Sequence, residues 1–211
     1  MRSAIVLAGG ISKRFGADKA MLRVRGKPMV SLVIEACIAA SADDVIVVVS
    51  TEGQRERLSE VLPREVTVVM DDVDRHQGAR GPLLGVATGL AYAKADYSFV
   101  AGCDVPLIRA RLIDYLFKRA ARGVDAVIPR WPNGYVEPLH AVYRVGSTLR
   151  AAEDAIRQGR QDLRSVARLL GRVDYVPTDE LKRLDEGLVS FINVNTQDDL
   201  AELLEVYGCP L

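Results

Sequence analysis

A glycine-rich segment that also carries cations is the first candidate for chemistry in this chain. Residues 7–19 read LAGGISKRFGADK and follow a short apolar run. Glycine lets backbone N–H groups approach an anion closely, while Arg14 offers a bidentate fork and Lys19 a point charge. We call residues 7–19 the signature loop and predict that it binds phosphate.

Spacing excludes two commoner phosphate-binding loops. The signature loop contains neither the dinucleotide fingerprint GxGxxG nor the P-loop pattern GxxxxGK followed by Ser or Thr. A tight strand-to-helix turn with solvated Lys and Arg is the structural alternative. That alternative would suit a lone Gly-Gly pair, but it leaves the whole 13-residue pattern unexplained.

Asp104 is the second candidate, because it ends an apolar run that reads FVAGCDVP over residues 99–106. A hard carboxylate oxygen suits Mg²⁺, which takes one or two carboxylates together with waters and substrate phosphates. We therefore predict that Asp104 is a metal ligand. Taken alone, an Asp that caps the following turn is an equal alternative. Cys103 has no base nearby in the sequence, so we interpret it as a small strand-end residue.

Asp71 and Asp72 follow another apolar run and precede the sequence GPLLG at residues 81–85. Pro82 is well suited to the first turn of a helix. Two loops would then face one crevice. Solvated loop charge is the alternative for one of the two aspartates, and plain helix initiation is the alternative for GPLLG.

Short β-branched runs alternate with segments of helical period, and these elements must position the motifs. The runs, four of which predict buried parallel strands, are Ala4–Leu7, Val45–Val49, Val66–Met70, Tyr97–Ala101 and Ala126–Ile128. The helical segments between them are Met29–Ala39, Gln54–Leu62, Leu83–Ala93 and Leu112–Ala121. In open α/β sheets ligands bind beyond the carboxyl ends of the strands, so the motifs should meet there.

The alternation of short strands and helices changes after Pro129, where we predict a longer strand over Val136–Arg144 and an antiparallel edge to the sheet. Thr196 should cap a final helix through Tyr207, with Asp198 and Asp199 favouring its first turn. The remaining predictions are helices at Ser147–Gln158 and Leu163–Leu170 and strands at Val173–Val176 and Phe191–Val194.

These elements predict an α/β fold: a single Rossmann-like domain over residues 1–211, with a mostly parallel central sheet, an antiparallel strand and helices on both faces. A chain of 211 residues with 49% hydrophobic content can bury the core of one domain.

Composition limits the classes of partner. Lys plus Arg and Asp plus Glu number 28 each, so no charge excess points to nucleic acid or a membrane surface. The N-terminal apolar run is too short for a signal peptide, and no stretch approaches the roughly 20 apolar residues of a spanning helix. We therefore expect a cytoplasmic protein. Cys37, Cys103 and Cys209 form neither a disulfide framework nor a zinc pattern and should be reduced thiols.

The pattern LAGGxSxRFGxDKA resembles the signature of nucleotidyltransferases that activate sugars, pterins and cobinamides. It is followed in order by GPLLG, by CDVP at 103–106, by EPLHAVY at 137–143 and by FINVNT at 191–196. The whole set, which spans nearly the entire chain, resembles the molybdenum-cofactor guanylyltransferase family. The resemblance implies transfer of GMP from GTP to the molybdopterin cofactor with release of pyrophosphate. It also implies a nucleotide-binding part at about 1–125 and a pterin-substrate part at about 126–211.

The resemblance further implies roles for individual residues. The implied nucleotide contacts are Leu7, Ala8, Gly9, Gly10, Ser12, Lys19, Asp71 or Asp72, Gly81, Pro82, Leu83 and Asp104. Catalysis is implied for Arg14, Lys19 and Asp104, the last of these holding Mg²⁺. The implied pterin contacts are Arg160, Arg164, Asn193 and Asn195. Transient contacts with cofactor-delivering and cofactor-receiving proteins would accompany this function.

Two features depart from the family pattern, and several of the implied roles have alternative interpretations. His140 occupies a position where the family pattern suggests an apolar residue, and we interpret it as a packed strand residue. The long loop at 73–80 leaves the register of Asp71 against Asp72 open. Arg160 and Arg164 could be surface charge, and one of the two asparagines could be only a turn residue. The competing functions are cytidylyl transfer to the same cofactor, nucleotidyl transfer to a sugar or cobinamide phosphate, and a catalytically silent nucleotide-binding adaptor.

Overall fold

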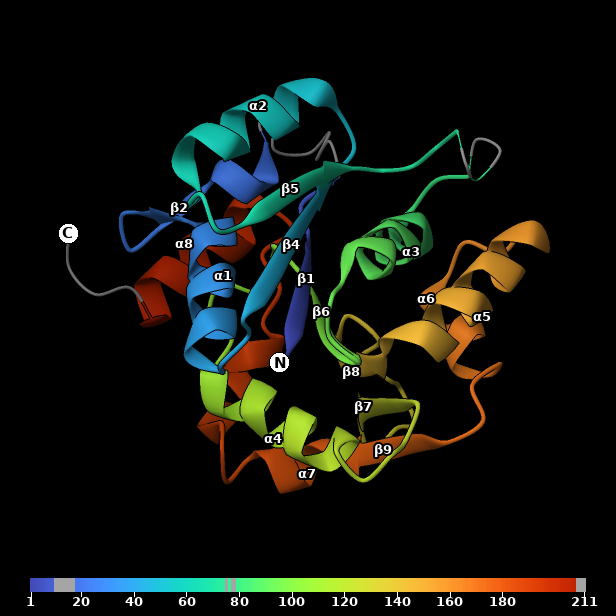
Figure 1. The fold of residues 1–211 in the computed structure, drawn as a ribbon. Coiled ribbons are helices and arrows are strands. Elements are labelled where there is room, and N and C mark those ends of the chain that lie inside the picture. The colour runs from blue at the N-terminus through green and yellow to red at the C-terminus, as the bar shows by residue number, and fades with distance from the viewer. Residues whose placement is uncertain (10–17, 75, 77–78, 208–211) are drawn as a thin grey trace.

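The computed structural model describes residues 1–9, 18–74, 76 and 79–207. These residues form a seven-stranded sheet with the strand order β5-β4-β1-β6-β8-β7-β9 (Figure 1). Its strands are β1 Ser3–Leu7, β4 Asp44–Val49, β5 Thr67–Met70, β6 Tyr97–Gly102, β7 Ala126–Arg130, β8 His140–Arg144 and β9 Val173–Pro177. Strands β5, β4, β1 and β6 pair in parallel, while β8 pairs antiparallel with both β6 and β7. The predicted mostly parallel α/β sheet is confirmed.

Helices cover both faces of the sheet, as predicted (Figure 1). One face packs against α1 Met29–Ala39, α2 Glu52–Val61, α4 Ala110–Ala120 and α7 Thr178–Leu181. The other face packs against α3 Pro82–Tyr92, α5 Val145–Arg157 and α6 Leu163–Ala167. The strand side chains alternate between these two layers: Ala4 and Val6 belong to the first core cluster, and Ile5 belongs to the second.

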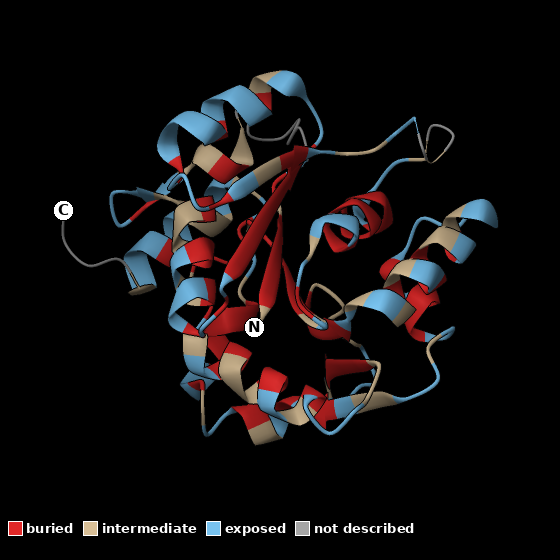
Figure 2. Cartoon of the chain, viewed as in Figure 1, coloured by how far each residue is buried: buried red, intermediate tan, exposed pale blue. Residues whose placement is uncertain are grey.

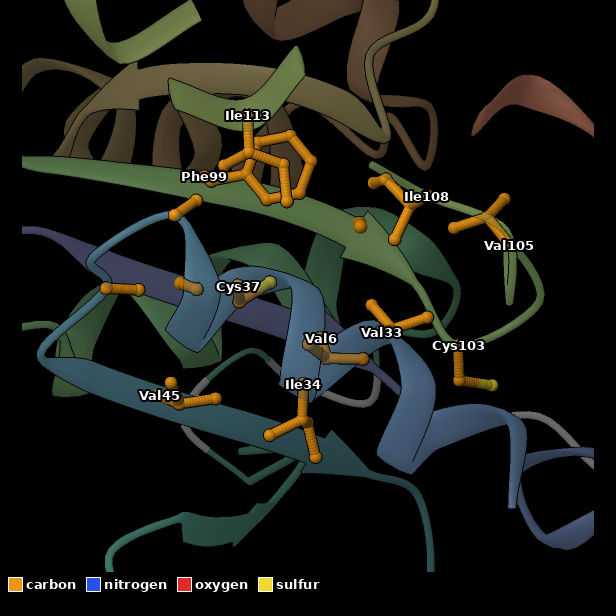
Figure 3. Packing of buried hydrophobic residues seen from close by; sticks show 14 of the residues in the cluster. Val6, Val33, Ile34, Cys37, Val45, Phe99, Cys103, Val105, Ile108 and Ile113 are labelled. Atoms are coloured by element: carbon orange, nitrogen blue, oxygen red, sulfur yellow. The ribbon is translucent and has the colours of Figure 1, made fainter. Parts of the chain in front are cut away.

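The central strands are buried on both sides, which explains their continuous apolar runs (Figure 2). In the first layer, Val33, Ile34 and Cys37 of α1 pack toward Val6 of β1, and Ile113 of α4 packs beside Phe99 of β6 (Figure 3). A smaller cluster seats helix α8, Gln197–Tyr207, through Leu203. The remaining elements are η1 Lys19–Met21, the two-stranded ribbon β2 Arg23–Val24 with β3 Lys27–Pro28, and η2 Glu186–Phe191.

The predicted strand Val136–Arg144 is too long, and the predicted antiparallel edge is wrong. Strand β8 begins only at His140, because residues 137–140 form a turn in which His140 N donates to Glu137 O over 3.1 Å. Val136 makes only an isolated bridge with Arg130. Strand β8 lies inside the sheet, between β6 and β7, and β9 forms this edge instead.

The predicted strand Phe191–Val194 is also wrong. Phe191 ends η2, Ile192 is extended, and residues 192–195 belong to no strand. Gly187 with φ 74° and Leu188 with φ 52° turn the chain inside η2. Val194 N then donates to Asp104 O over 2.9 Å, so an isolated contact replaces a strand ladder.

The predicted start of the last helix is confirmed. Asp199 N donates to Thr196 Oγ1 over 3.1 Å, and Thr196 N donates to Asp199 Oδ2 over 2.9 Å. This reciprocal pair satisfies N–H groups that the first helical turn leaves free. Across the described residues, no helix combines the length and the apolar character needed to cross a membrane.

Candidate active site

The four parallel strands end at one edge of the sheet, and the candidate residues follow these ends. Leu7 lies in register with Val48 and with Gly102, and Val49 lies in register with Met70. The chain therefore leaves β1, β4, β5 and β6 along a single line. Polar groups on the four following loops are brought together there, as the prediction from parallel topology requires.

Lys19 joins three distant segments at this edge. Its Nζ donates to Asp104 Oδ2 over 2.9 Å and to Asn195 Oδ1 over 2.8 Å. Asp18 holds the start of η1 in place by accepting a hydrogen bond from Ala20 N. The side chains of Lys19 and Asp104 are 15% and 27% exposed, so the ion pair is shielded from water but open to a ligand. The structure therefore unites one predicted phosphate-binding cation, the predicted metal ligand and one predicted pterin contact.

Asp104 is fixed by its backbone and by a glycine. Its carbonyl accepts from Val194 N, and the preceding Cys103 N donates to Leu7 O over 3.0 Å. A Cβ atom at Gly102 would collide with Asp104 Oδ1, so only glycine lets the carboxylate fold back over the end of β6. The side chain is therefore aimed by packing as well as by Lys19.

The donor set fits Mg²⁺ rather than a metal that needs a full protein cage. In the part of the chain that the structure describes, no three His, Cys, Asp or Glu side chains gather to hold an ion. Asp104 supplies one partly exposed carboxylate. Mg²⁺ usually takes one or two carboxylates and completes its shell with water and substrate phosphates.

Asp71 forms a second cluster on the far side of β1. Its Oδ2 accepts from Ser50 Oγ over 2.9 Å, while its Oδ1 is buried and has no hydrogen-bond partner among the described residues. Burial raises the pKa of this carboxyl group. A Cβ atom at Gly85 would lie 3.5 Å from Asp71 Oδ1 and 3.1 Å from Leu7 Cδ2, so Gly85 lets α3 approach both residues. The cluster thus presents a buried acceptor beside an apolar side chain.

Asp72 faces elsewhere. Its backbone N donates to Thr88 Oγ1 over 3.1 Å. Asp72 also helps to line a cavity of about 170 Å³, together with Tyr92 of α3 and with Leu149 and Glu153 of α5. The two neighbouring carboxylates, which the sequence leaves equivalent, therefore lie in different surroundings.

Leu7, Ala8 and Gly9 leave little free backbone for a nucleotide. Leu7 O accepts from Cys103 N, while Ala8 N donates to Val48 O over 2.8 Å. Ala8 O accepts a longer bond of 3.4 Å from Nε2 of Gln54, a buried residue that sequence reasoning missed. A Cβ atom at Gly9 would collide with Ser50 Oγ. The Leu7 side chain and the surface of Gly9 are thus the groups left for contact.

At the start of α3, Gly81 has φ 95° and precedes Pro82, which occupies the first turn as predicted. Leu83 is 1% exposed, backbone included, and belongs to the core. The predicted contacts Gly10 and Ser12 and the predicted catalytic Arg14 lie outside the described residues.

The predicted pterin contacts fall into two sets. Asn193 Nδ2 donates to Phe191 O over 3.1 Å, and Asn195 reaches Lys19. Arg160 and Arg164 are exposed, and the Arg164 guanidinium lies 5.5 Å from the ring centroid of Tyr135. Among the described residues no hydrogen bond or ion pair links one set to the other.

Buried polar groups behind Asp104 were not predicted as a network. His140 is 3% exposed, its Nε2 lies 2.7 Å from Ser190 O, and burial lowers the pKa of its imidazole. Its prediction as a packed strand residue is confirmed. Asp185 is fully buried and accepts from Ser190 N and from Arg109 Nε, which anchors the segment leading to Asn193. Sequence gave no indication of these pairings, because the partners come from β8, the start of α4 and η2.

Cys103 is 6% exposed, and burial raises the pKa of its thiol to about 12, with the charge of Asp104 acting in the same direction. A thiol that stays protonated is a poor nucleophile. Its interpretation as a strand-end packing residue is confirmed.

Comparison with known proteins agrees with this arrangement. The model of the MobA-like NTP transferase domain family matches residues 4–174. The chain is 35% identical over 208 residues to the "Probable molybdenum cofactor guanylyltransferase" of Methanosarcina mazei, covering 96% of this chain and 90% of that protein. It is 38% identical over 202 residues to the protein of the same name from Thermococcus gammatolerans, covering 94% and 96%.

A solved structure shows the same fold over nearly the whole chain. The crystal structure of molybdopterin-guanine dinucleotide biosynthesis protein A from Archaeoglobus fulgidus superposes with a TM-score of 0.81 at 30% identity, and the match covers 98% of both chains. The fold, the strand-end residues and the sequence similarity lead to one conclusion: this chain is a nucleotidyltransferase that belongs to the MobA-like NTP transferase domain family.

Proposed function

We propose that the protein transfers GMP from GTP to the terminal phosphate of molybdopterin, with release of pyrophosphate and with Mg²⁺ as the cofactor. The observation that carries this proposal is the junction of Lys19, Asp104 and Asn195 at the carboxyl edge of the sheet. It combines a cation for phosphate, a carboxylate for a metal and an amide on the acceptor side. The names of relatives at 35% and 38% identity support the guanylyl and molybdenum-cofactor parts of the proposal.

In the proposed reaction, a phosphate oxygen of the acceptor attacks the α-phosphorus of GTP in line. A new P–O bond forms as the bond to pyrophosphate breaks, and pyrophosphate leaves with the bonding electron pair. The attacking oxygen is already anionic, so positioning and charge neutralisation matter more than a general base. Lys19 supplies positive charge from a partly shielded position, and Arg14 of the signature loop is proposed to add a second cation.

Asp104 would hold the Mg²⁺ ion, which when bound neutralises phosphate charge. In the described structure Lys19 balances the Asp104 carboxylate. We propose that this ammonium group turns toward the α-phosphate when substrate brings its own metal ion. Lys19 would then pair with Asp104 in the absence of substrate and with the α-phosphate when substrate and metal are bound.

Guanine selectivity is proposed to depend on Asp71. Guanine carries an N1–H and an exocyclic amino group that a carboxylate can accept, and adenine lacks that pair of donors. Asp71 Oδ1 is a buried acceptor without a described partner, and it lies beside Leu7 and Gly85 where a base could stack. This favours Asp71 over Asp72. The nucleotide-binding part is proposed to lie within about residues 1–125 and the pterin-binding part within about 126–211.

The test is a nucleotide screen with purified protein, molybdopterin and Mg²⁺, with the dinucleotide product detected by mass. GTP should give the guanine dinucleotide and pyrophosphate. Product from CTP at an equal or higher rate would replace guanylyl with cytidylyl transfer, and product only from a sugar or cobinamide phosphate would change the acceptor. Nucleotide binding without any transfer would support the adaptor alternative.

A further inference from the structure

The connection between β7 and β8, residues 131–139, contains a tight turn and carries the carboxylate of Glu137. Trp131 N donates to Tyr135 O over 2.8 Å, and Arg130 bridges Val136. Glu137 N then donates to Pro129 O over 2.9 Å, and Glu137 O accepts from His140 N. The backbone of Glu137 is therefore bonded on both sides.

The carboxylate of Glu137 is only half satisfied. Trp131 Nε1 donates to Glu137 Oε1 over 2.6 Å. Glu137 is partly buried, and among the described residues it has no ion pair and its second oxygen, Oε2, accepts no hydrogen bond. A neutral acceptor would be enough to bind a single indole N–H. The carboxylate of Glu137 therefore keeps a second oxygen that can accept hydrogen bonds from a ligand.

This carboxylate lies along the wall that carries the proposed acceptor site. The rings of Trp131 and Phe191 meet edge to face with centroids 5.7 Å apart. Asn193 Nδ2 bonds Phe191 O, and Val194 N bonds Asp104 O. A continuous series of contacts thus leads from Asp104, past the asparagine segment, to Trp131 and Glu137.

His140 of β8 packs against the same wall. Its ring lies 4.9 Å from the Phe191 ring, and its Nε2 lies 2.7 Å from Ser190 O. Phe191 therefore contacts the rings of both Trp131 and His140. A molecule whose phosphate reaches Asp104 could extend its other end along this wall toward Glu137.

We propose that Glu137 is a specificity-determining residue that accepts hydrogen bonds from the amino group and adjacent ring N–H of the acceptor's pterin, with Trp131 orienting the carboxylate. This inference rests on the proposed function and deepens it. A pterin presents a 2-amino-4-oxo edge, whose neighbouring donors match carboxylate acceptors. The partly exposed Trp131 adds an aromatic surface beside that edge.

Trp131 is the single tryptophan of the chain, so its fluorescence reports directly on this site. We would titrate the full-length protein with pterin-6-carboxylate and, separately, with lumazine-6-carboxylate. The second ligand has the same ring system but carries a carbonyl in place of the amino group. It therefore places a hydrogen-bond acceptor, instead of a donor, opposite the Glu137 carboxylate. We expect saturable quenching by both, with the pterin bound about tenfold or more tightly.

The Glu137→Gln variant should reduce that preference to less than about threefold, because its amide replaces one acceptor by a donor. Glu65→Gln, on an exposed loop, is the matched charge control and should keep the preference. Equal affinities for the two ligands in the unmutated protein would overturn the proposal without reference to any variant. An unchanged preference in folded Glu137→Gln would also overturn it.

GMP transfer to molybdopterin, measured by mass on the same preparations, separates this inference from the proposed function. In Glu137→Gln we expect KM for the acceptor to rise about tenfold while KM for GTP stays unchanged. If the unmutated protein transfers GMP but binds the pterin and the lumazine equally well, only the role of Glu137 is contradicted. Absence of transfer by the unmutated protein would remove the proposed function, whatever the fluorescence shows.

Discussion

The ammonium group of Lys19 lies 2.9 Å from the carboxylate of Asp104, although 85 positions separate the two residues in sequence. Lys19 ends the signature loop that follows β1, and Asp104 follows β6, a direct neighbour of β1. Asn195 meets the same ammonium from the other end of the chain. The Lys19 ammonium group therefore links the proposed metal ligand Asp104 to the proposed acceptor-side residue Asn195.

Asp104→Asn should abolish most turnover and leave the fold intact. Loss of a preorganised charge at the reacting phosphate typically costs about 3–4 kcal/mol, or about 10²–10³-fold in kcat. The Lys19 ion pair is partly exposed, so its loss should change the melting temperature by only a few degrees. Pyrophosphate release and thermal unfolding would be measured on the same sample. Near-normal turnover at low Mg²⁺ with an unchanged melting temperature would remove Asp104 from the metal site.

Lys19→Met should lower kcat/KM for GTP by about 10² or more, because a positioned charge leaves a shielded phosphate site. Lys27→Met is the matched control, since Lys27 is exposed and pairs only with Glu35 on α1 in the described structure. Steady-state kinetics with varied GTP would compare them. A loss below about threefold, under about 1 kcal/mol, would make Lys19 an ordinary surface residue.

Asp71→Asn should reduce the preference for GTP over ATP by about 5- to 150-fold, because an unpaired buried donor or acceptor costs roughly 1–3 kcal/mol. Asp72→Asn should leave the preference unchanged. Burial raises the pKa of Asp71, so its carboxyl group takes up a proton at a higher pH than an exposed Asp does. Selectivity should accordingly fall as the pH is lowered through that raised pKa. The measurement is kcat/KM for both nucleotides across pH, and a ranking that neither substitution changes would assign base selection to backbone groups.

Two glycine substitutions should separate the site from the fold. Gly102→Ala places a methyl group against the movable end of the Asp104 side chain, so it should lower kcat with little change in stability. Gly89→Ala drives a methyl group from α3 into the buried Ile5 side chain and should cost about 1–3 kcal/mol of unfolding free energy. Denaturant unfolding and kinetics on the folded fraction would be compared. Equal kinetic losses in both variants would contradict the placement of Asp104 over Gly102.

His140→Gln should flatten the pH dependence of stability. Burial lowers the pKa of His140 in the folded state, so below the unfolded value of about 6.5 the unfolded chain binds the extra proton. The unfolding free energy should therefore fall as the pH drops below about 6.5, by up to about 1.4 kcal/mol per pH unit. Urea unfolding at several pH values would measure the difference between the two proteins. An identical slope in the variant would mean that His140 keeps its ordinary pKa in the folded state.

The sequence by itself determined the α/β class, the parallel strands, most helices and the positions of Lys19, Asp71 and Asp104 in the segments that follow the strands. Local properties explain this success, because buried strands need β-branched runs and helices need their period. The same local properties could not predict that residues 191–194 leave the sheet, because that depends on a contact between Val194 N and Asp104 O.

Tertiary structure alone decided which of two adjacent carboxylates places a buried oxygen beside Leu7 and Gly85. Asp71 and Asp72 have the same chemistry and neighbouring positions, so no local pattern distinguishes them. Asp71 is placed against Ser50, Leu7 and the glycine face of α3, whereas Asp72 faces the cavity toward α5. Likewise, the orientation of the Glu137 carboxylate depends on the indole of Trp131, six residues earlier, which the turn in the β7–β8 connection brings against it. The residue types are local, but burial, pairing and orientation arise only when distant elements pack together.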